Sequence, residues 1–392
     1  MVIELATFVA GPSAGLALAQ LGATVVRMDP LGGAVDVNRW PLAPNGRSLY
    51  WSALNRGKHS ITLDLHSEAG REVALRLICA PGTDRGVLMD NVVAADWLSW
   101  EALSGRRADL IHIHIEGTRD GRAAVDYTVN AETGVPFITG PEADSGPVNH
   151  VLPAWDLLTG MTVSTALLAA LRRRDRFGTG ARVDIALADV ALAGVANLGW
   201  FSEVAATGRD RDRQGNAIYG SYGRDFATAD GRYVMVVALT PAQWRALVGI
   251  TGSDAAIAAL EAEHAVDLVR DESARYRLRA EISAILEPWF GARNLDSVTA
   301  ALSEARVLSA PFRSLAETAT AMPGPLQELD QPGIGPVISA TSPMRWRDYD
   351  PPVHASSALG ADTMTVLAEL SDLDPGEIDR LVEDGVIGPA DA

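Results

Sequence analysis

An aspartate, Asp156, stands where a loop ending in Pro153 gives way to a long apolar run at 157–171. Leu, Met, Val and Ala recur through this run at helical spacing, so the pattern predicts a helix that begins at Asp156. A carboxylate there would cap the helix, accepting hydrogen bonds from free backbone N–H groups at the positive end of the helix dipole. Both effects would hold the pKa of Asp156 down and keep it ionised, as a nucleophile requires. Most aspartates that precede a helix are caps alone, so the residues by themselves favour a structural role.

A second candidate is the basic turn Asn55-Arg56-Gly57-Lys58, which precedes a predicted strand at 60–65. Glycine in the turn lets the backbone approach a phosphate, and the two cations supply charge for it. The turn therefore suits an anionic ligand, but a solvated basic turn without a ligand fits the same residues.

Two histidines, His112 and His114, share one face of a predicted strand at 110–115. This spacing could suit a metal ion, but no cluster of Cys, Asp or Glu accompanies it in the sequence, so it predicts structural histidines and no metal. The single cysteine, Cys79, lies in an apolar segment and is expected to be a buried small hydrophobe.

The composition excludes several classes of protein. There are 33 basic and 50 acidic side chains, giving a formal net charge of −17, which argues against a nucleic-acid partner. No apolar run approaches the ~20 residues of a membrane span, and the N-terminus lacks a signal-peptide pattern. One cysteine rules out a disulfide framework. These features predict a soluble, cytoplasmic protein with no membrane partner.

The order of elements predicts an α/β fold. A strand at 2–9, a helix through Leu18 and a strand at 23–28 form a strand–helix–strand unit, which indicates a parallel sheet. After residue 200 a polar, Gly-rich stretch, a hairpin signal and an apolar strand at 233–239 indicate a second, smaller α+β domain. The predicted boundaries are a large domain at 1–200 and 344–392, a linker with a Gly-rich loop at 201–224, a small domain at 225–312 and a return linker at 313–343.

The segment around Asp156 resembles the core signature of a known family. An aspartate opens a helix, followed by Gly160, an Ala-Leu run, an Arg cluster at 172–174, a Gly-x-Gly turn and a VDIAL strand. This order is similar to that of the family III CoA-transferases, which include the α-methylacyl-CoA racemases, and the similarity extends over 2–388. It implies an enzyme that acts on acyl-CoA thioesters and carboxylates, with Asp156 as nucleophile, CoA as part of the substrate and no prosthetic group.

The resemblance also implies an architecture, an interlocked ring-shaped homodimer whose subunits combine a Rossmann-like large domain with a smaller α+β domain. Members usually carry several residues before the first strand. Here Met1 stands in their place, so we expect a late start or a short first strand.

Further site residues follow from the resemblance. For CoA it implies Ala10, Arg39, Asn55, Arg56, Lys58 and Asn91. For the substrate and a closing loop it implies Asn130, His150, Gly215, Gly220 and Arg224. The candidates for binding the free carboxylate of a short dicarboxylate are Arg39, Asn130, His150 and Arg224.

The family contains two main chemistries. Racemases need acid and base groups on both faces of the carbon next to the thioester, but Val125 and Thr240 occupy the positions of the racemase His and Glu. CoA transfer through covalent intermediates on Asp156 is therefore favoured.

Stretches at 28–41, 126–141, 148–156 and 213–232 resemble a subgroup that moves CoA between the two carboxylates of one molecule. Transfer between two molecules, racemisation, and acyl-CoA binding without catalysis are the alternatives.

Overall fold

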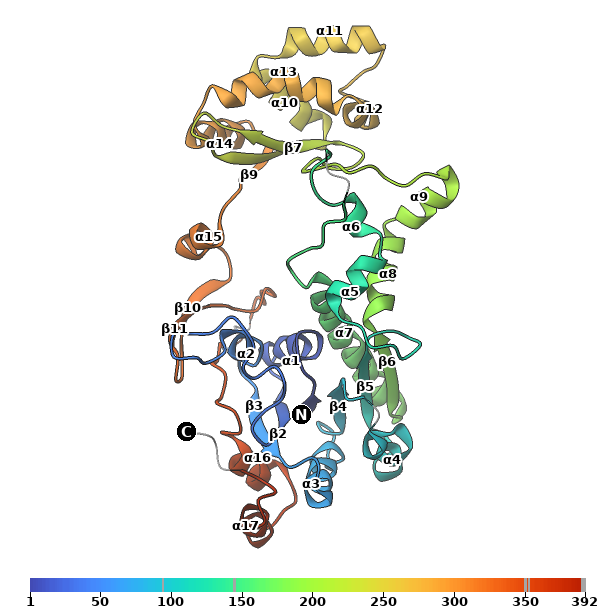
Figure 1. Ribbon diagram of the computed structural model, residues 1–392, viewed down its shortest axis with the longest axis vertical. Helices are drawn as coiled ribbons and strands as arrows, with labels where there is room; N and C mark the ends of the chain where they lie inside the picture. Colours follow the sequence, from blue (N-terminus) through green and yellow to red (C-terminus); the bar gives the residue numbers. More distant parts are fainter. Residues whose placement is uncertain (94, 144–145, 349–350, 352, 389–392) are drawn as a thin grey trace. The chain divides into compact units, whose positions relative to one another are not determined.

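The computed structural model describes residues 1–93, 95–143, 146–348, 351 and 353–388. The chain divides into two compact units, each formed by segments far apart in the sequence (Figure 1). Unit 1 comprises Met1–Thr133, His150–Thr207 and Met322–Ala392, and unit 2 comprises Gly134–Asn149 and Gly208–Ala321. The predicted boundaries put all of 1–200 in the large domain, whereas Gly134–Asn149 belongs to unit 2.

Unit 1 is built on a six-stranded sheet in which every neighbouring pair is parallel. The strand order is β3-β2-β1-β4-β5-β6. The strands are β1 (Val2–Leu5), β2 (Val25–Pro30), β3 (His59–Leu63), β4 (Val87–Asp90), β5 (Ile111–Glu116) and β6 (Ala181–Ala186). The order reverses between β1 and β4, and ligands of open α/β sheets bind at the carboxyl ends of the strands at such a point. The predicted α/β fold with a parallel sheet is confirmed.

Helices cover both faces of this sheet, so its strands bury polar residues such as Glu4 and Arg27 together with their apolar ones. On one face, Val25 and Ile113 pack with Leu18 of α1 (Ala10–Gln20) and Leu167 of α7 (Ala154–Phe177). On the other face, strand residues such as Leu88 pack against helices α3, α16 and α17.

The remaining elements of unit 1 are short helices and one hairpin. They are α2 (Leu49–Leu54), α3 (Glu68–Ile78), η1 (Asp96–Leu98), α4 (Trp100–Arg106), α5 (Asp126–Glu132), α8 (Leu187–Asn197), α9 (Trp200–Thr207), β10 (Leu326–Gln331), β11 (Gly335–Ala340), α16 (Thr363–Leu370) and α17 (Pro375–Glu383). The predicted linker at 201–224 therefore begins inside α9, and the return linker at 313–343 contains the β10–β11 hairpin.

Unit 2 is an α+β arrangement around an antiparallel sheet of order β7-β8-β9. Its elements are α6 (Val135–Ile138), β7 (Tyr222–Ala227), β8 (Tyr233–Ala238), α10 (Pro241–Thr251), α11 (Asp254–His264), α12 (Glu272–Arg277), α13 (Arg279–Gly291), α14 (Leu295–Glu304), β9 (Leu308–Pro311) and α15 (Leu315–Ala321). Phe226 of β7 stacks on Phe290 of α13 with ring centroids 4.0 Å apart, inside the core that joins sheet and helices.

The expectation about membrane spans needs a correction at α7. Among the described residues, this helix is long and apolar enough to cross a membrane by length and composition, with a mean hydropathy of 1.4 over 18 residues. The bent pair α8–α9 would count as a second such segment. Nevertheless α7 packs along α1 and β5 and buries Val163 and Leu167, as a core helix of a globular unit does.

Candidate active site

Helix α7 begins at Ala154, with Pro153 as its N-cap, so Asp156 is the third helical residue and not the predicted cap. The capping carboxylate comes from Asp126, the first residue of α5. Its Oδ2 accepts hydrogen bonds from the backbone N–H of Trp155 at 2.7 Å and of Asp156 at 3.0 Å. A carboxylate from another helix thus satisfies N–H groups that would otherwise lack an intrahelical partner.

The environment of Asp156 raises its pKa to about 6. Burial is the main cause, the charge of Asp126 adds to it, and Arg39 offsets part of the effect. The prediction of a lowered pKa is wrong, because Asp126 accepts the amide hydrogen bonds that would have stabilised an ionised Asp156. At pH 7 such a group is still roughly nine-tenths ionised and more basic than an ordinary aspartate, which suits a nucleophile.

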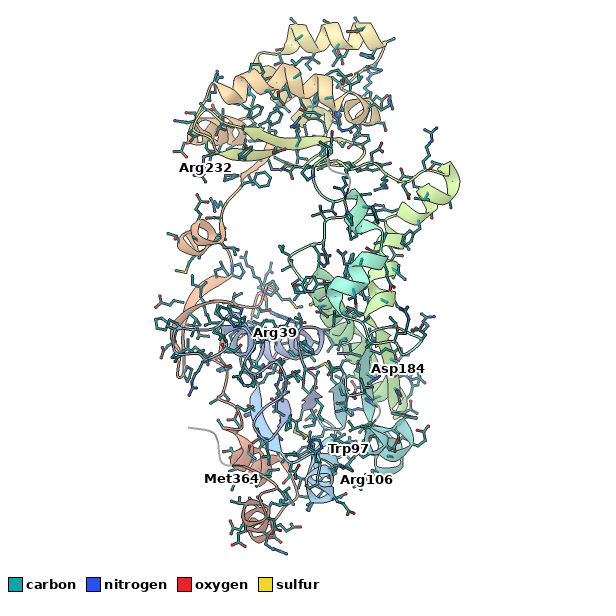
Figure 2. All side chains as sticks on the ribbon, viewed as in Figure 1. Arg39, Trp97, Arg106, Asp184, Arg232 and Met364 are labelled. Atoms are coloured by element: carbon teal, nitrogen blue, oxygen red, sulfur yellow. The ribbon has the colours of Figure 1, made fainter. Side chains whose placement is uncertain are left out.

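Arg39 provides a cation near Asp156. Its guanidinium lies 5.3 Å from the ring centroid of Phe8 and 5.5 Å from that of Tyr50. Figure 2 shows Arg39 beside α1 and α2. Phe8 has the left-handed φ of +67°, and its N–H donates to Oδ2 of Asp36 at 2.9 Å. The two rings orient the guanidinium by cation–π contacts, while the side chain stays exposed and free to bind an anion.

Gly160, one helical turn after Asp156, brings α7 against the first turn of α1. A β-carbon at Gly160 would lie 2.1 Å from Oγ of Ser13 and 2.8 Å from the carbonyl oxygen of Ala10. Because residues four apart share one face of a helix, Asp156 lies on the side of α7 that faces α1. Ala10, predicted as a site residue, therefore lies at the candidate site, where the first N–H groups of α1 lack intrahelical partners.

Asn130 and His150, predicted to hold the substrate, instead contact the neighbours of Asp156. Asn130 is 1% exposed, and its Oδ1 accepts from the indole N–H of Trp155 at 2.9 Å. Nε2 of His150 pairs with Oδ1 of Asp126 at 2.5 Å. Asn130 is too buried to reach a substrate, and His150 supports the carboxylate that caps α7.

The basic turn holds its lysine inside the protein. Nζ of Lys58 donates to Oε1 of Glu4 at 2.8 Å, to the carbonyl of Pro12 at 2.9 Å and to Oδ1 of Asn55 at 2.9 Å. These bonds use all three ammonium protons. Burial lowers the pKa of Lys58 to about 8, although Glu4 opposes the shift. In this structure the ammonium of Lys58 has internal partners, and its contact with CoA stays a prediction.

The other side chains of the turn are also internal. Arg56 donates to the carbonyl of Ala340 at 2.9 Å and to Oγ of Ser339, both in β11. The amide of Asn55 donates to the carbonyl of Trp51 at 2.9 Å and is 3% exposed. Both residues fix the turn against the rest of unit 1, and their contact with CoA stays a prediction.

Asn91 follows β4 and links the end of that strand to the loop after β1. Its Oδ1 accepts from the backbone N–H of Thr7 at 3.2 Å, and its Nδ2 donates to the carbonyl of Thr7 at 3.3 Å. Asn91 therefore fixes the loop that carries Phe8.

Unit 2 contains a cavity of about 690 Å³ lined by parts of the Gly-rich segment, by β7 and by the start of α13. Gly215 and Arg224 both line it, whereas Gly220 does not belong to its described lining. Nη1 of Arg224 lies 3.6 Å from Oε1 of Glu287.

Asp90, at the end of β4, joins the two histidines of β5. It bonds to Nε2 of His112 at 2.5 Å and to Nδ1 of His114 at 2.8 Å, each through a different oxygen. The three residues offer ligand atoms within 4.8 Å of one another, so an acidic partner exists that the sequence pattern did not reveal. Burial alone would raise the pKa of Asp90, but the two imidazoles outweigh it and leave that pKa lowered. The distances are those of a hydrogen-bonded triad.

Comparison with known proteins adds to this geometry. The model of CoA-transferase family III matches residues 1–363. The chain belongs to CoA-transferase family III. It is 44% identical over 398 residues to 2-methylfumaryl-CoA isomerase of Chloroflexus aurantiacus, covering 100% of this chain and 97% of that protein. It is 29% identical over 406 residues to succinyl-CoA:mesaconate CoA-transferase of Haloarcula marismortui, with 96% of each covered. A solved CaiB/BaiF family structure from Brucella suis superimposes with a TM-score of 0.76 at 27% identity, covering 94% of this chain and 98% of that one.

Membership of CoA-transferase family III confirms the resemblance drawn from the residues around Asp156 and identifies the chain as an enzyme of CoA thioesters. The residues at the two positions that would carry racemase bases are helix N-caps here. Val125 is the N-cap of α5, and Oγ1 of Thr240 accepts from the backbone N–H of Gln243 at the start of α10.

Proposed function

We propose that the chain is a 2-methylfumaryl-CoA isomerase, which moves CoA from the C1 to the C4 carboxylate of one mesaconyl molecule. The observation that carries the proposal is Asp156, a partly buried carboxylate with a pKa near 6 beside the exposed cation of Arg39. The 44% identity to the Chloroflexus isomerase over the full chain supports the choice of substrate.

In the proposed reaction, the carboxylate of Asp156 attacks the C1 thioester carbonyl. The C–S bond breaks, giving CoA thiolate and a mixed anhydride between Asp156 and mesaconate. The thiolate then attacks the carbonyl of Asp156, which releases mesaconate and leaves an aspartyl-CoA thioester. The C4 carboxylate of the retained mesaconate attacks this thioester, and the freed thiolate attacks the C4 acyl carbon of the new anhydride. Product forms and the Asp156 carboxylate is regenerated.

The tetrahedral oxyanions of these steps need hydrogen-bond donors. We assign this role to the first backbone N–H groups of α1, at Ala10 and Gly11, because Gly160 brings that turn against α7. Arg39 would bind the carboxylate that is not reacting, since its guanidinium is exposed and oriented by Phe8 and Tyr50. Keeping mesaconate in place makes the second attack effectively unimolecular.

For unit 2, we propose that the segment around Gly215 and Gly220 is a loop that changes conformation during the reaction. Both glycines have positive φ, +55° and +76°, and such backbone is easily adopted only by glycine. Arg224 would present its charge in the cavity it shares with Gly215.

The proposed assembly is a homodimer, and the proposed compartment is the cytoplasm. Apolar side chains on α7 are exposed in the single chain, with Leu157 at 37%, Leu158 at 42% and Met161 at 46%. A second copy of the chain would cover them. The lone thiol of Cys79 is compatible with a reducing compartment.

The direct test is to incubate purified protein with mesaconyl-C1-CoA without added acid and to follow the C4 isomer by chromatography and mass spectrometry. We expect wild type to form the isomer and Asp156→Ala to form none. Substrate binding by wild type without any turnover or covalent adduct would instead indicate an acyl-CoA-binding protein.

Transfer between two molecules is the second candidate, because the chain resembles a succinyl-CoA:mesaconate CoA-transferase over 96% of its length. An exposed Arg39 would also bind the carboxylate of a free acid. Adding ¹³C-labelled mesaconate to the isomerase assay separates the two: intramolecular transfer gives unlabelled product, whereas intermolecular transfer incorporates the label.

A further inference from the structure

The carboxylate of Asp126 is enclosed by three donors around the start of α7. One oxygen accepts from the backbone N–H groups of Trp155 and Asp156, and the other pairs with His150. Asp126 is only 1% exposed, so its hydrogen bonds are formed within the protein and not with solvent. One of those donors is the main chain of the proposed nucleophile itself.

Other contacts hold both Asp126 and the start of α7 in place. Asp126 is the first residue of α5, which packs on α7 and α8, and Figure 1 shows α5 beside these helices. On the other side, the indole of Trp155 is bound by Asn130 of the same helix α5. Helix α5 therefore binds two consecutive residues of α7, Trp155 and the proposed nucleophile Asp156.

The charges around Asp156 come from several elements. Asp126 faces it from α5, with His150 bonded behind Asp126, while Arg39 and Tyr50 interact with it from the segment that includes α2. Asp126 disfavours and Arg39 favours the ionised form of Asp156. Neither effect comes from a residue of α7 itself.

We propose that Asp126 is a positioning residue for the nucleophile, fixing the backbone of Asp156 through its amide. This inference rests on the proposed function. His150 is a second positioning residue, because its bond to Asp126 holds the carboxylate in the orientation that caps α7.

A simple helix cap would affect folding alone. Losing a cap lowers the stability of the fold and would lower activity only through the folded fraction. A positioning residue has two further effects: its loss changes the pH at which Asp156 ionises, and it displaces the reacting oxygen from its productive geometry.

The test compares Asp126→Asn with wild type and with Glu132→Gln, a control on the same helix whose side chain is 64% exposed. In Asp126→Asn we expect the ionisation midpoint of Asp156, followed by ¹³C NMR of aspartate carboxyl groups, to move down by about one pH unit. We expect kcat at pH 7.5 to fall roughly 10- to 100-fold, and Glu132→Gln to change neither quantity. The NMR midpoint is read without substrate, so it tests the inference even if the isomerase activity is absent.

Asp126→Glu is the second test variant, to be used if the asparagine variant does not fold. Its longer side chain keeps the charge but cannot accept from both amides at the same distances, so we expect the acid limb of the pH profile to stay while kcat falls at least tenfold. An unchanged kcat in Asp126→Glu, or an unchanged Asp156 midpoint in folded Asp126→Asn, would overturn the inference.

Discussion

A β-carbon at Gly160 would lie 2.1 Å from Oγ of Ser13, so Gly160 lets α7 pack closely against the first turn of α1. Gly160→Ala should therefore push the two helices apart. We expect a loss of stability of about 1–3 kcal/mol from overpacking, together with a fall in kcat larger than the loss of folded protein explains. Chemical denaturation and assays at saturating substrate measure the two effects. Gly249→Ala, where a β-carbon would meet nothing within 4 Å, is the control. Equal activity per folded molecule in both variants would contradict the link between this contact and catalysis.

Activity should depend on pH through Asp156. The ionised form is the nucleophile and its pKa is raised to about 6, so kcat/KM should fall as the pH drops through about 6 and approach a tenfold loss per pH unit below it. A pH profile measured in buffers of constant ionic strength checks this. An acid limb centred near pH 4, typical of exposed aspartate, would show that Asp156 is not shielded.

The same raised pKa makes Asp156 a source of instability. For an acid whose pKa is higher in the folded state, folding is favoured below the unfolded pKa, and this contribution is lost as the pH rises through about 6. Asp156→Asn removes the charge, so it should stabilise the fold by up to about 2 kcal/mol at pH 8 and have little effect at about pH 3, below the unfolded pKa. Denaturant titrations of both proteins at the two pH values test the sign. A variant less stable than wild type at pH 8 would contradict it.

Lys58 should matter for folding and not for CoA affinity. Lys58→Met leaves the buried carboxylate of Glu4 without its ammonium partner, and breaking such a buried pair costs about 3–5 kcal/mol. The double change Glu4→Gln with Lys58→Met should recover much of that loss. Denaturation gives the stabilities, and isothermal titration with CoA gives the affinity of whichever protein folds. A double variant of normal stability that binds CoA tenfold more weakly would confirm Lys58 as a ligand contact.

Arg39 should affect both the substrate and the nucleophile. Its charge lowers the pKa of Asp156, so Arg39→Gln should move the acid limb of the pH profile to higher pH. Losing a charge-assisted hydrogen bond to the substrate carboxylate should also raise KM by roughly tenfold or more. Arg47→Gln, an exposed arginine before α2, is the matched control. If both variants give the same KM and profile, Arg39 has neither role.

Local patterns in the sequence were sufficient for the fold, whereas the choice of Asp156 as the proposed nucleophile depended on the resemblance to the family. The strand–helix–strand start and the apolar run after Asp156 are periodic signals within a few tens of residues, and burial on a two-faced parallel sheet explains them. The position of Asp156 within α7 could not be predicted from local patterns. The residue that caps the helix, Asp126, lies 30 positions away, and helix-cap patterns consider only adjacent residues.

The partners of Lys58 in the basic turn and of the two histidines could not be predicted for a related reason. Lys58, just before β3, resembles a surface cation until Glu4 of β1, which lies on the other side of β2, is placed against it. Likewise, the partner of His112 and His114 is Asp90 on β4, more than 20 residues earlier, and it is placed by strand pairing. Sheet register decides these contacts, and the sequence near each residue does not contain it.

The shielding of Asp156 also affects the proposed intermediates. An anhydride or thioester on Asp156 carries no charge, so acylation removes the carboxylate that burial disfavours. The acylated protein should then resist heat better than the resting enzyme, and a trapped adduct should melt at a higher temperature. In this protein, burying the ionised carboxylate of Asp156 costs free energy in the resting enzyme, and release of that cost favours formation of the covalent intermediate.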